Sequence, residues 1–186
     1  FQSTLADGFE TAWQPSGPYR LVYDTAATGN ERYPNVDALL REFLAGAVVF
    51  TDRLRKFKIL RGLGNAPGEA RPERTEAKLS GAGLPSVAVS FRMLADLYDV
   101  PGGLFDTAPS LAASVESRIL AKTARSAAES LEFHKTPLTE IAQEDGPVAN
   151  EVRLLADLLI YQERFLKSGF LASLGLASGF TAADGD

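Results

Sequence analysis

The chain has 186 residues, 45% hydrophobic and 23% charged, which is the composition of an ordinary globular protein. Its net charge of -5 argues against a phosphate-binding surface over the whole molecule, so nucleic acid is not an expected partner. The absence of cysteine excludes disulfides, thiolate nucleophiles and cysteine-ligated metals. Because the sequence begins at Phe1 rather than Met, a targeting peptide would not be seen, and the compartment is left open.

Residues 1–35 predict an irregular N-terminal arm, broken by proline and glycine. Residues 20–23 fit a short strand and Gly29-Asn30 fits a turn, so the arm holds either a short strand pair or no regular structure. Many aromatic side chains lie in this arm: Phe1, Phe9, Trp13, Tyr19, Tyr23 and Tyr33. We expect them to cover one end of the protein's own core or, alternatively, to clasp a partner chain.

A long helix is predicted from about Val36 to Arg61, with Asn35 as its N-cap and glycines after its end. At about 100° per residue, one apolar stripe is predicted to face the core. It consists of Val36, Leu39, Leu40, Phe43, Ala47, Phe50, Leu54 and Phe57. Val48, Val49 and Ile59 lie off this stripe, which indicates that the back of the helix is also covered, by this chain or by another subunit.

The rest of the chain predicts more helices, separated by glycine and proline. After a connector over residues 65–85, residues 86–93 alternate like a strand, but continuation into Met93–Tyr98 favours a helix. Long helices are predicted over about 108–134 and 147–167, and a short one lies between them. The fold class is therefore an all-α bundle of three long helices and two or three short ones. Its expected parts are the arm (1–35), a helical domain (36–167) and an apolar tail (168–186) that packs on the domain or a partner.

The longest uncharged stretch, residues 168–183, contains glycines and serines and is shorter than the ~20 apolar residues of a membrane helix. No transmembrane segment is predicted, while a peripheral membrane contact stays open. With His134 as its single histidine, the chain cannot form a two-histidine di-iron, zinc-protease or haem site, so no metal or cofactor is expected. No phosphate-loop or serine-elbow motif occurs, and the glycine-rich piece 62–68 is interpreted as a helix terminator.

Polar residues in apolar helix arcs are the sequence's main site candidates. Arg61 lies in line with the core stripe, and Gln162 lies among leucines, so each is either paired, exposed at a helix end, or part of a ligand pocket or an interface. Tyr98 and Tyr161 are expected to line such a pocket with them, and His134 is the remaining candidate. A basic run covers the end of the long helix and the connector: Arg53, Arg55, Lys56, Lys58 and Arg61, then Arg71, Arg74 and Lys78. Its members on the helix point in almost every direction, which favours solvation, and an acidic partner protein or an anionic ligand is the alternative.

The leading hypothesis is a non-catalytic interaction protein, an accessory or assembly subunit that binds another protein or its own copies. The residues expected to bind a partner are Trp13, Tyr19, Val48, Val49, Ile59, Phe170 and Leu174. The alternatives are a bundle that binds a small molecule between its long helices, and an enzyme that uses His134. For the enzyme, Glu132 points away from His134 along the helix and Glu116 is too distant to orient it, so no catalytic residue is assigned.

Overall fold

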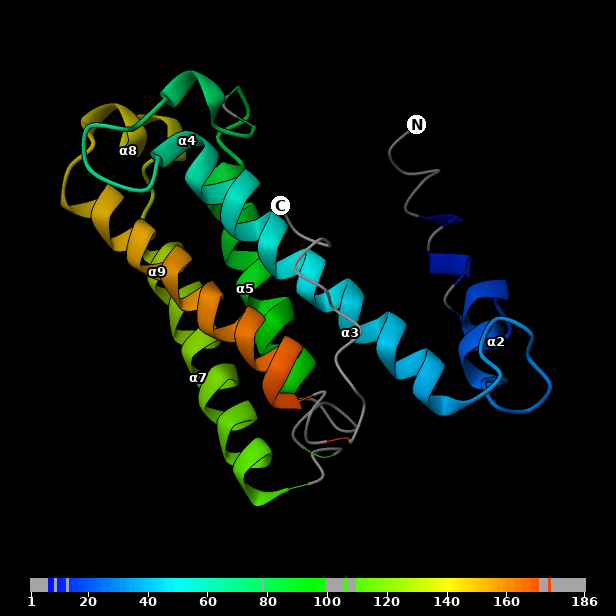
Figure 1. Cartoon of the computed structure of the whole chain (residues 1–186). Coiled ribbons are helices and arrows are strands. Elements are labelled where there is room, and N and C mark those ends of the chain that lie inside the picture. Colours follow the sequence, from blue (N-terminus) through cyan, green and yellow to red (C-terminus); the bar gives the residue numbers. More distant parts are fainter. Residues whose placement is uncertain are drawn as a thin grey trace. The chain divides into compact units, whose positions relative to one another are not determined.

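A computed structural model of the chain describes residues 7–8, 10–12, 14–77, 79–99, 106, 110–170 and 174 (Figure 1). Over these residues the secondary structure is entirely helical, which confirms the predicted all-α class. The chain divides into two compact units, Phe1–Gly46 and Ala47–Asp186, and each is described by itself. None of the described helices is long and apolar enough to cross a membrane.

In the first unit, the predicted strand over residues 20–23 is wrong, because these residues belong to helix α2, Pro18–Asp24. Pro18 stands in the first turn, where its fixed φ favours a helix and its missing N–H is not needed. Arg20 and Asp24, one turn apart, form an ion pair at 2.9 Å. The helix therefore follows from a local start signal that outweighs the β-forming tendency of Val22 and Tyr23.

A turn after α2 buries one aromatic side chain of the arm. The Asn30 side chain donates to the carbonyl of Val22 at 2.6 Å and accepts from the N–H of Tyr33 at 3.1 Å. The Tyr33 ring lies 5.7 Å from the Tyr23 ring, and Tyr33 is 1% exposed. At this turn, the arm packs two of its own aromatic rings together.

The long helix is continuous but changes its winding. It consists of α3 (Val36–Arg53), a π-helical segment η1 (Leu54–Leu60) and a last turn α4 (Arg61–Leu63). As predicted, Asn35 caps its start by accepting from the N–H of Ala38 at 2.8 Å.

The predicted core-facing stripe of this helix is only partly correct: Leu54 enters the core and Phe50 packs against it. Phe43 and Phe57 on the stripe are 44% and 55% exposed. In α3 the buried side chains Leu44, Val48 and Thr51 lie roughly a quarter turn around the helix from this stripe. Further on, Leu54, Ile59 and Leu63 are buried. In a π-helix, residues five apart share a face, so Leu54 and Ile59 both enter the core, which a constant 100° per residue could not foresee.

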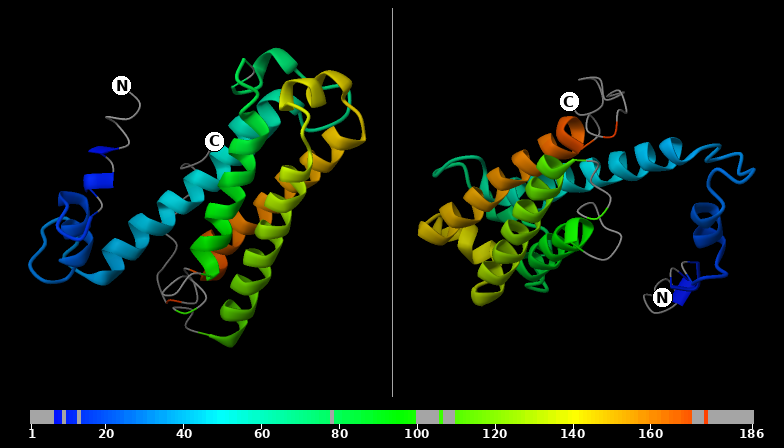
Figure 2. Two further views of the ribbon diagram at one scale, coloured as in Figure 1. Left: turned by 180° about the vertical axis from the view of Figure 1, so that it is seen from behind. Right: turned by 90° about the horizontal axis from the view of Figure 1, so that it is seen from below.

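The second unit contains an antiparallel hairpin of α5 (Gly83–Asp99) and α7 (Leu111–Phe133), seen in Figures 1 and 2. The ion pair of Arg92 with Glu132 and the 3.3 Å pair of Arg125 with Asp99 fix its antiparallel register. Residues 86–93 are therefore helical, as favoured from the sequence. Val87 and Phe91 lie one turn apart on the buried face of this helix, whereas Val89 is exposed on another face. Their alternation therefore does not reflect a strand.

The remaining elements of this unit are η2 (Pro72–Arg74), α8 (Leu138–Glu144), α9 (Pro147–Arg164) and a second π-helical segment, η3 (Phe165–Phe170). The segment η1 packs against both α5 and α9, while α8 lies with α4 and η2 at one end (Figure 1). Leucines, alanines and Phe91 from all the long helices form one core between them. The three predicted long helices are thus present.

Candidate functional site

A hollow of about 550 Å³ lies where the long helix ends. Three arginines from three successive pieces of the chain line it: Arg61 from α4, Arg71 from the following loop and Arg74 from η2. Its other lining residues are Leu60, Gly64, Asn65, Gly68, Glu69 and Ala70. The hollow is thus built almost entirely from the helix end and the loop that follows it.

The glycine-rich sequence shapes this loop. Gly64 ends the helix with a φ of +69°, and a Cβ there would lie 2.5 Å from the Cβ of Glu69, so only glycine fits without strain. The loop then folds back on the helix end, because the N–H of Arg71 donates to the carbonyl of Gly62 at 2.7 Å. This return brings Arg71 and Arg74 beside Arg61.

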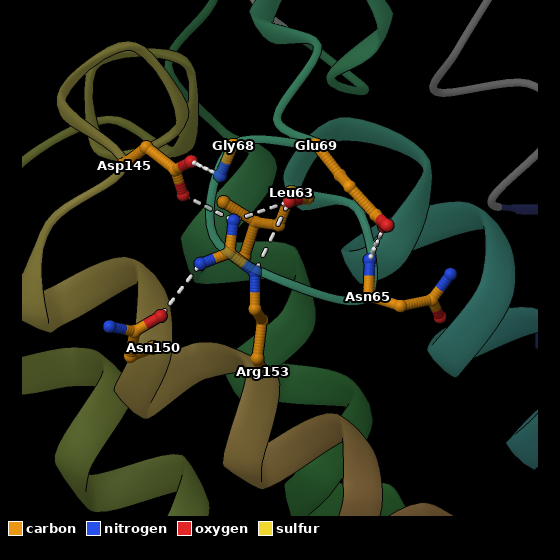
Figure 3. A network of polar contacts seen from close by, with 7 residues as sticks. All are labelled: Leu63, Asn65, Gly68, Glu69, Asp145, Asn150 and Arg153. Carbon is orange, nitrogen blue, oxygen red and sulfur yellow. Dashed lines mark hydrogen bonds and ion pairs between the residues drawn. The ribbon is translucent and has the colours of Figure 1, made fainter.

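A buried arginine on α9 fastens the loop from beneath (Figure 3). Arg153 is 6% exposed, and its Nε and Nη2 donate to the carbonyl of Leu63 at 3.2 and 2.5 Å. Its Nη1 donates to Asn150 at 2.8 Å, and its Nη2 forms an ion pair with Asp145. Each nitrogen of the guanidinium therefore has a partner, as a buried charge requires.

Asp145 continues this network into the loop. It ends α8 with a φ of +44°, and its second carboxylate oxygen accepts from the N–H of Gly68 at 2.5 Å. The hydrogen bond from Arg153 and, second, that from Gly68 hold the pKa of Asp145 below its usual range. One carboxylate thus joins the loop to α9. Thr75 and Thr139 add a hydroxyl contact of 2.8 Å between η2 and α8.

The hollow is cationic within an acidic protein. Among the described residues, neither Arg61 nor Arg71 has an ion pair with a carboxylate, and both are exposed. The nearest approach of Arg74 to Glu73 is a long 3.9 Å contact. The carboxylate of Glu69 accepts from the backbone N–H of Asn65 at 3.0 Å. Positive charge at the hollow therefore lacks close partners within the described part of the chain.

The loop itself is not a phosphate cradle. Its N–H groups at Gly64, Asn65, Gly68, Glu69 and Arg71 all donate to acceptors of the chain. The interpretation of residues 62–68 as a helix terminator is therefore confirmed. Binding of an anion at this place would use the guanidinium groups.

The five ligand-binding residues predicted from the sequence do not meet in one pocket. Arg61 lines the hollow, and the lining residues include none of the other four. Tyr98 and Gln162 are both fully buried, whereas Tyr161 is 61% exposed. His134 stands at the C-terminal end of α7 with its ring contacting Phe133.

His134 has a carboxylate partner that local sequence could not supply. Its Nε2 lies 3.2 Å from Glu151 of α9, and the other oxygen of Glu151 accepts from the hydroxyl of Ser130 at 2.5 Å. The Ser130 bond first, and the contact with His134, lower the pKa of Glu151. The carboxylate thus stands between serine and histidine, so His134 is not placed to take the proton of Ser130 as a triad requires. No group of three or more metal-ligating side chains occurs among the described residues.

The residues predicted to bind a partner fall into three groups. Trp13 lies outside the described residues. Tyr19 and Val49 are 58% and 45% exposed, and Leu174 is partly exposed. Val48, Ile59 and Phe170 are buried within this chain, and Ile59 belongs to the core, so its cover comes from the chain's own helices rather than from another subunit.

Sequence reasoning missed Arg153 entirely. Its partner Leu63 lies 90 residues earlier in the chain, and Asp145 reaches Gly68 over 77 residues. No local spacing marks such a contact. The basic run did signal Arg61, Arg71 and Arg74, but their convergence depends on the loop that turns back at Gly64.

No family model, curated protein or solved structure matches the chain.

Proposed function

We propose that the protein is a non-catalytic binding protein that takes an anionic group of a small molecule into the arginine-lined hollow. The observation that carries this proposal is the convergence of Arg61, Arg71 and Arg74 on one hollow of about 550 Å³. Two of these arginines lack a carboxylate partner within the described part of the chain. Like charges brought together repel one another, and an anion relieves this repulsion.

Size and chemistry both support a small ligand. Sites for small molecules commonly measure about 300–1,000 Å³, a range that includes this hollow. Guanidinium groups bind phosphate and carboxylate oxygens through paired N–H donors, and they keep their charge at all physiological pH values. Arg153 and Asp145 fasten the backbone of the loop at Leu63 and Gly68, so less of the loop must be ordered when a ligand binds.

Calorimetric titration with pyrophosphate tests the proposal. We expect Arg61→Gln and Arg71→Gln each to weaken binding roughly tenfold or more, because each removes a charge-assisted hydrogen bond. Arg53→Gln is the matched control, since Arg53 is exposed on the same long helix but does not line the hollow. Pyrophosphate binding that is equally tight in all three variants would contradict the proposal, as would the absence of binding to the unmodified protein.

A protein partner is the second candidate function, and exposed apolar side chains favour it. Val89 and Met93 lie one turn apart on α5 and are 54% and 57% exposed. Val115 and Ile119 repeat this spacing on α7, with 50% and 57% exposed. Sedimentation over a range of concentrations would show self-association, and Met93→Gln with Ile119→Gln is expected to reduce it. A monomer at all concentrations would leave only a different partner protein for this role.

A further inference from the structure

Three polar side chains on three different helices are buried, and none has a hydrogen-bond partner among the residues that the structure describes. Tyr98 of α5, Ser117 of α7 and Gln162 of α9 are each 0% exposed. Neither hydroxyl, and neither polar atom of the Gln162 amide, has a hydrogen-bond partner within the described part of the chain. These atoms differ from Thr51 and Ser90, whose hydroxyls donate to backbone carbonyls one turn earlier, at 2.8 Å in both cases.

The three side chains belong to the same end of the second unit. Tyr98 stands next to the last residue of α5, Ser117 lies in the second turn of α7 and Gln162 in the last turn of α9. These helix ends lie together in both Figure 1 and Figure 2. The Tyr98 ring is 6.2 Å from the Phe165 ring, and Gln162 precedes Phe165 by one turn on the same face.

Such groups need an explanation. A buried donor or acceptor without a partner costs about 1–3 kcal/mol, and native proteins leave few of them. A leucine or methionine at position 162 would fill the same space without this cost. The presence of polar side chains at all three positions therefore indicates a bound molecule that forms hydrogen bonds with them.

We propose that this end of the bundle binds a small uncharged molecule that both donates and accepts hydrogen bonds. The Gln162 amide donates through Nε2 and accepts through Oε1, and the hydroxyls of Tyr98 and Ser117 do either. An amide or an alcohol satisfies this set. The site is separate from the arginine-lined hollow, and the inference does not rest on the function proposed for that hollow.

The surroundings select an uncharged occupant. None of the three side chains carries a charge, and the aromatic rings of Phe165 and Phe170, 5.9 Å apart, form an apolar neighbour. A buried anion would lose its hydration there without gaining an opposite charge, and the carboxylate of Glu116, which acts on Tyr98, is exposed to solvent. Burial and, second, the negative charge of Glu116 raise the pKa of Tyr98, so its hydroxyl keeps its proton.

Acetamide and acetate form a matched pair of probes, because they have nearly the same shape and differ in charge. We expect acetamide to raise the melting temperature by roughly 2–4 °C at saturating concentration and to move the side-chain amide resonance of Gln162. Acetate is expected to do neither at this site. If acetate does have an effect and Arg61→Gln abolishes it, acetate binds in the arginine-lined hollow instead.

Two variants make the result specific. Gln162→Met is expected to abolish the response to acetamide, whereas Gln143→Met, at an exposed glutamine of α8, is expected to retain it. If Gln162→Met does not fold, Ser117→Ala takes its place and is expected to reduce the response. If acetamide changes neither the Gln162 resonance nor the melting temperature of the unmodified protein, the proposal is overturned. Water would then be indicated as the only occupant. An equal response in wild type and Gln162→Met would also overturn it.

Discussion

Arg153 and Gln162 stand nine residues apart on α9, both are buried, and their surroundings are opposite. The charged side chain has a partner for each of its nitrogens, while the neutral one has none among the described residues. Burial alone does not distinguish the two side chains. A satisfied buried polar group holds parts of the structure together, whereas the unsatisfied Gln162 is where we propose that a small molecule binds.

The largest effect is expected from removing the satisfied group. Arg153→Leu leaves Asp145 and the carbonyl of Leu63 without their donor, which should lower the free energy of unfolding by about 3–5 kcal/mol. Arg164→Leu, at an exposed arginine of the same helix, is the control and should change it by less than about 0.5 kcal/mol. Urea denaturation measures both. A loss below about 1 kcal/mol for Arg153→Leu would mean that the network does not hold the loop.

The loop fastened by Arg153 offers a second test. Gly64→Ala places a Cβ against Glu69 at a positive φ, and we expect a loss of about 1–3 kcal/mol, measured by thermal denaturation. Gly46→Ala is the matched control, because Gly46 lies in α3 with open space around it and alanine favours a helix by about 0.5–1 kcal/mol. If both variants were stabilising, the turn at Gly64 would not be as tight as described.

Removing the unsatisfied group should have the opposite sign. In the absence of any added ligand, Gln162→Met is expected to raise the free energy of unfolding by about 1 kcal/mol, since it removes a buried amide without changing the side-chain length much. Gln143→Met, at an exposed position, should be close to neutral. Destabilisation by Gln162→Met would show that the amide already has partners, and the contrast with Arg153 would disappear.

The smallest effect concerns a partly exposed polar cluster, Ser130, His134 and Glu151. The folded protein holds the pKa of Glu151 below its ordinary value of 4.5. The ionised carboxylate therefore makes its full contribution to the free energy of unfolding at any pH above 4.5. It is lost as the pH falls through the lowered, folded-state pKa. Glu151→Gln should therefore lower the melting temperature slightly at neutral pH and leave it unchanged in acid. The expected change in the free energy of unfolding at neutral pH is about 0–1 kcal/mol. An equal loss at both pH values would point to packing rather than charge.

Local sequence signals predicted the helices well. The Asn35 cap and the proline starts mark helix beginnings, and Gly64 marks an end, because caps and breakers act on the residues beside them. Pro18 is the instructive exception. Its proline ring favours the start of a helix, but the β-forming residues after it predicted a strand.

Only the tertiary structure decided which faces are buried and which polar groups meet. Along α3 the buried face already differs from the predicted stripe, and within η1, which packs against α5 and α9, the winding differs from the constant 100° per residue that periodicity assumes. The convergence of three arginines and the pairing of Arg153 with Leu63 depend on contacts across distant parts of the chain. By itself, the sequence determined that Gln162 is a polar residue in an apolar arc. The fold determined that it is buried without a partner, since satisfaction of a hydrogen bond depends on what the neighbouring helices present.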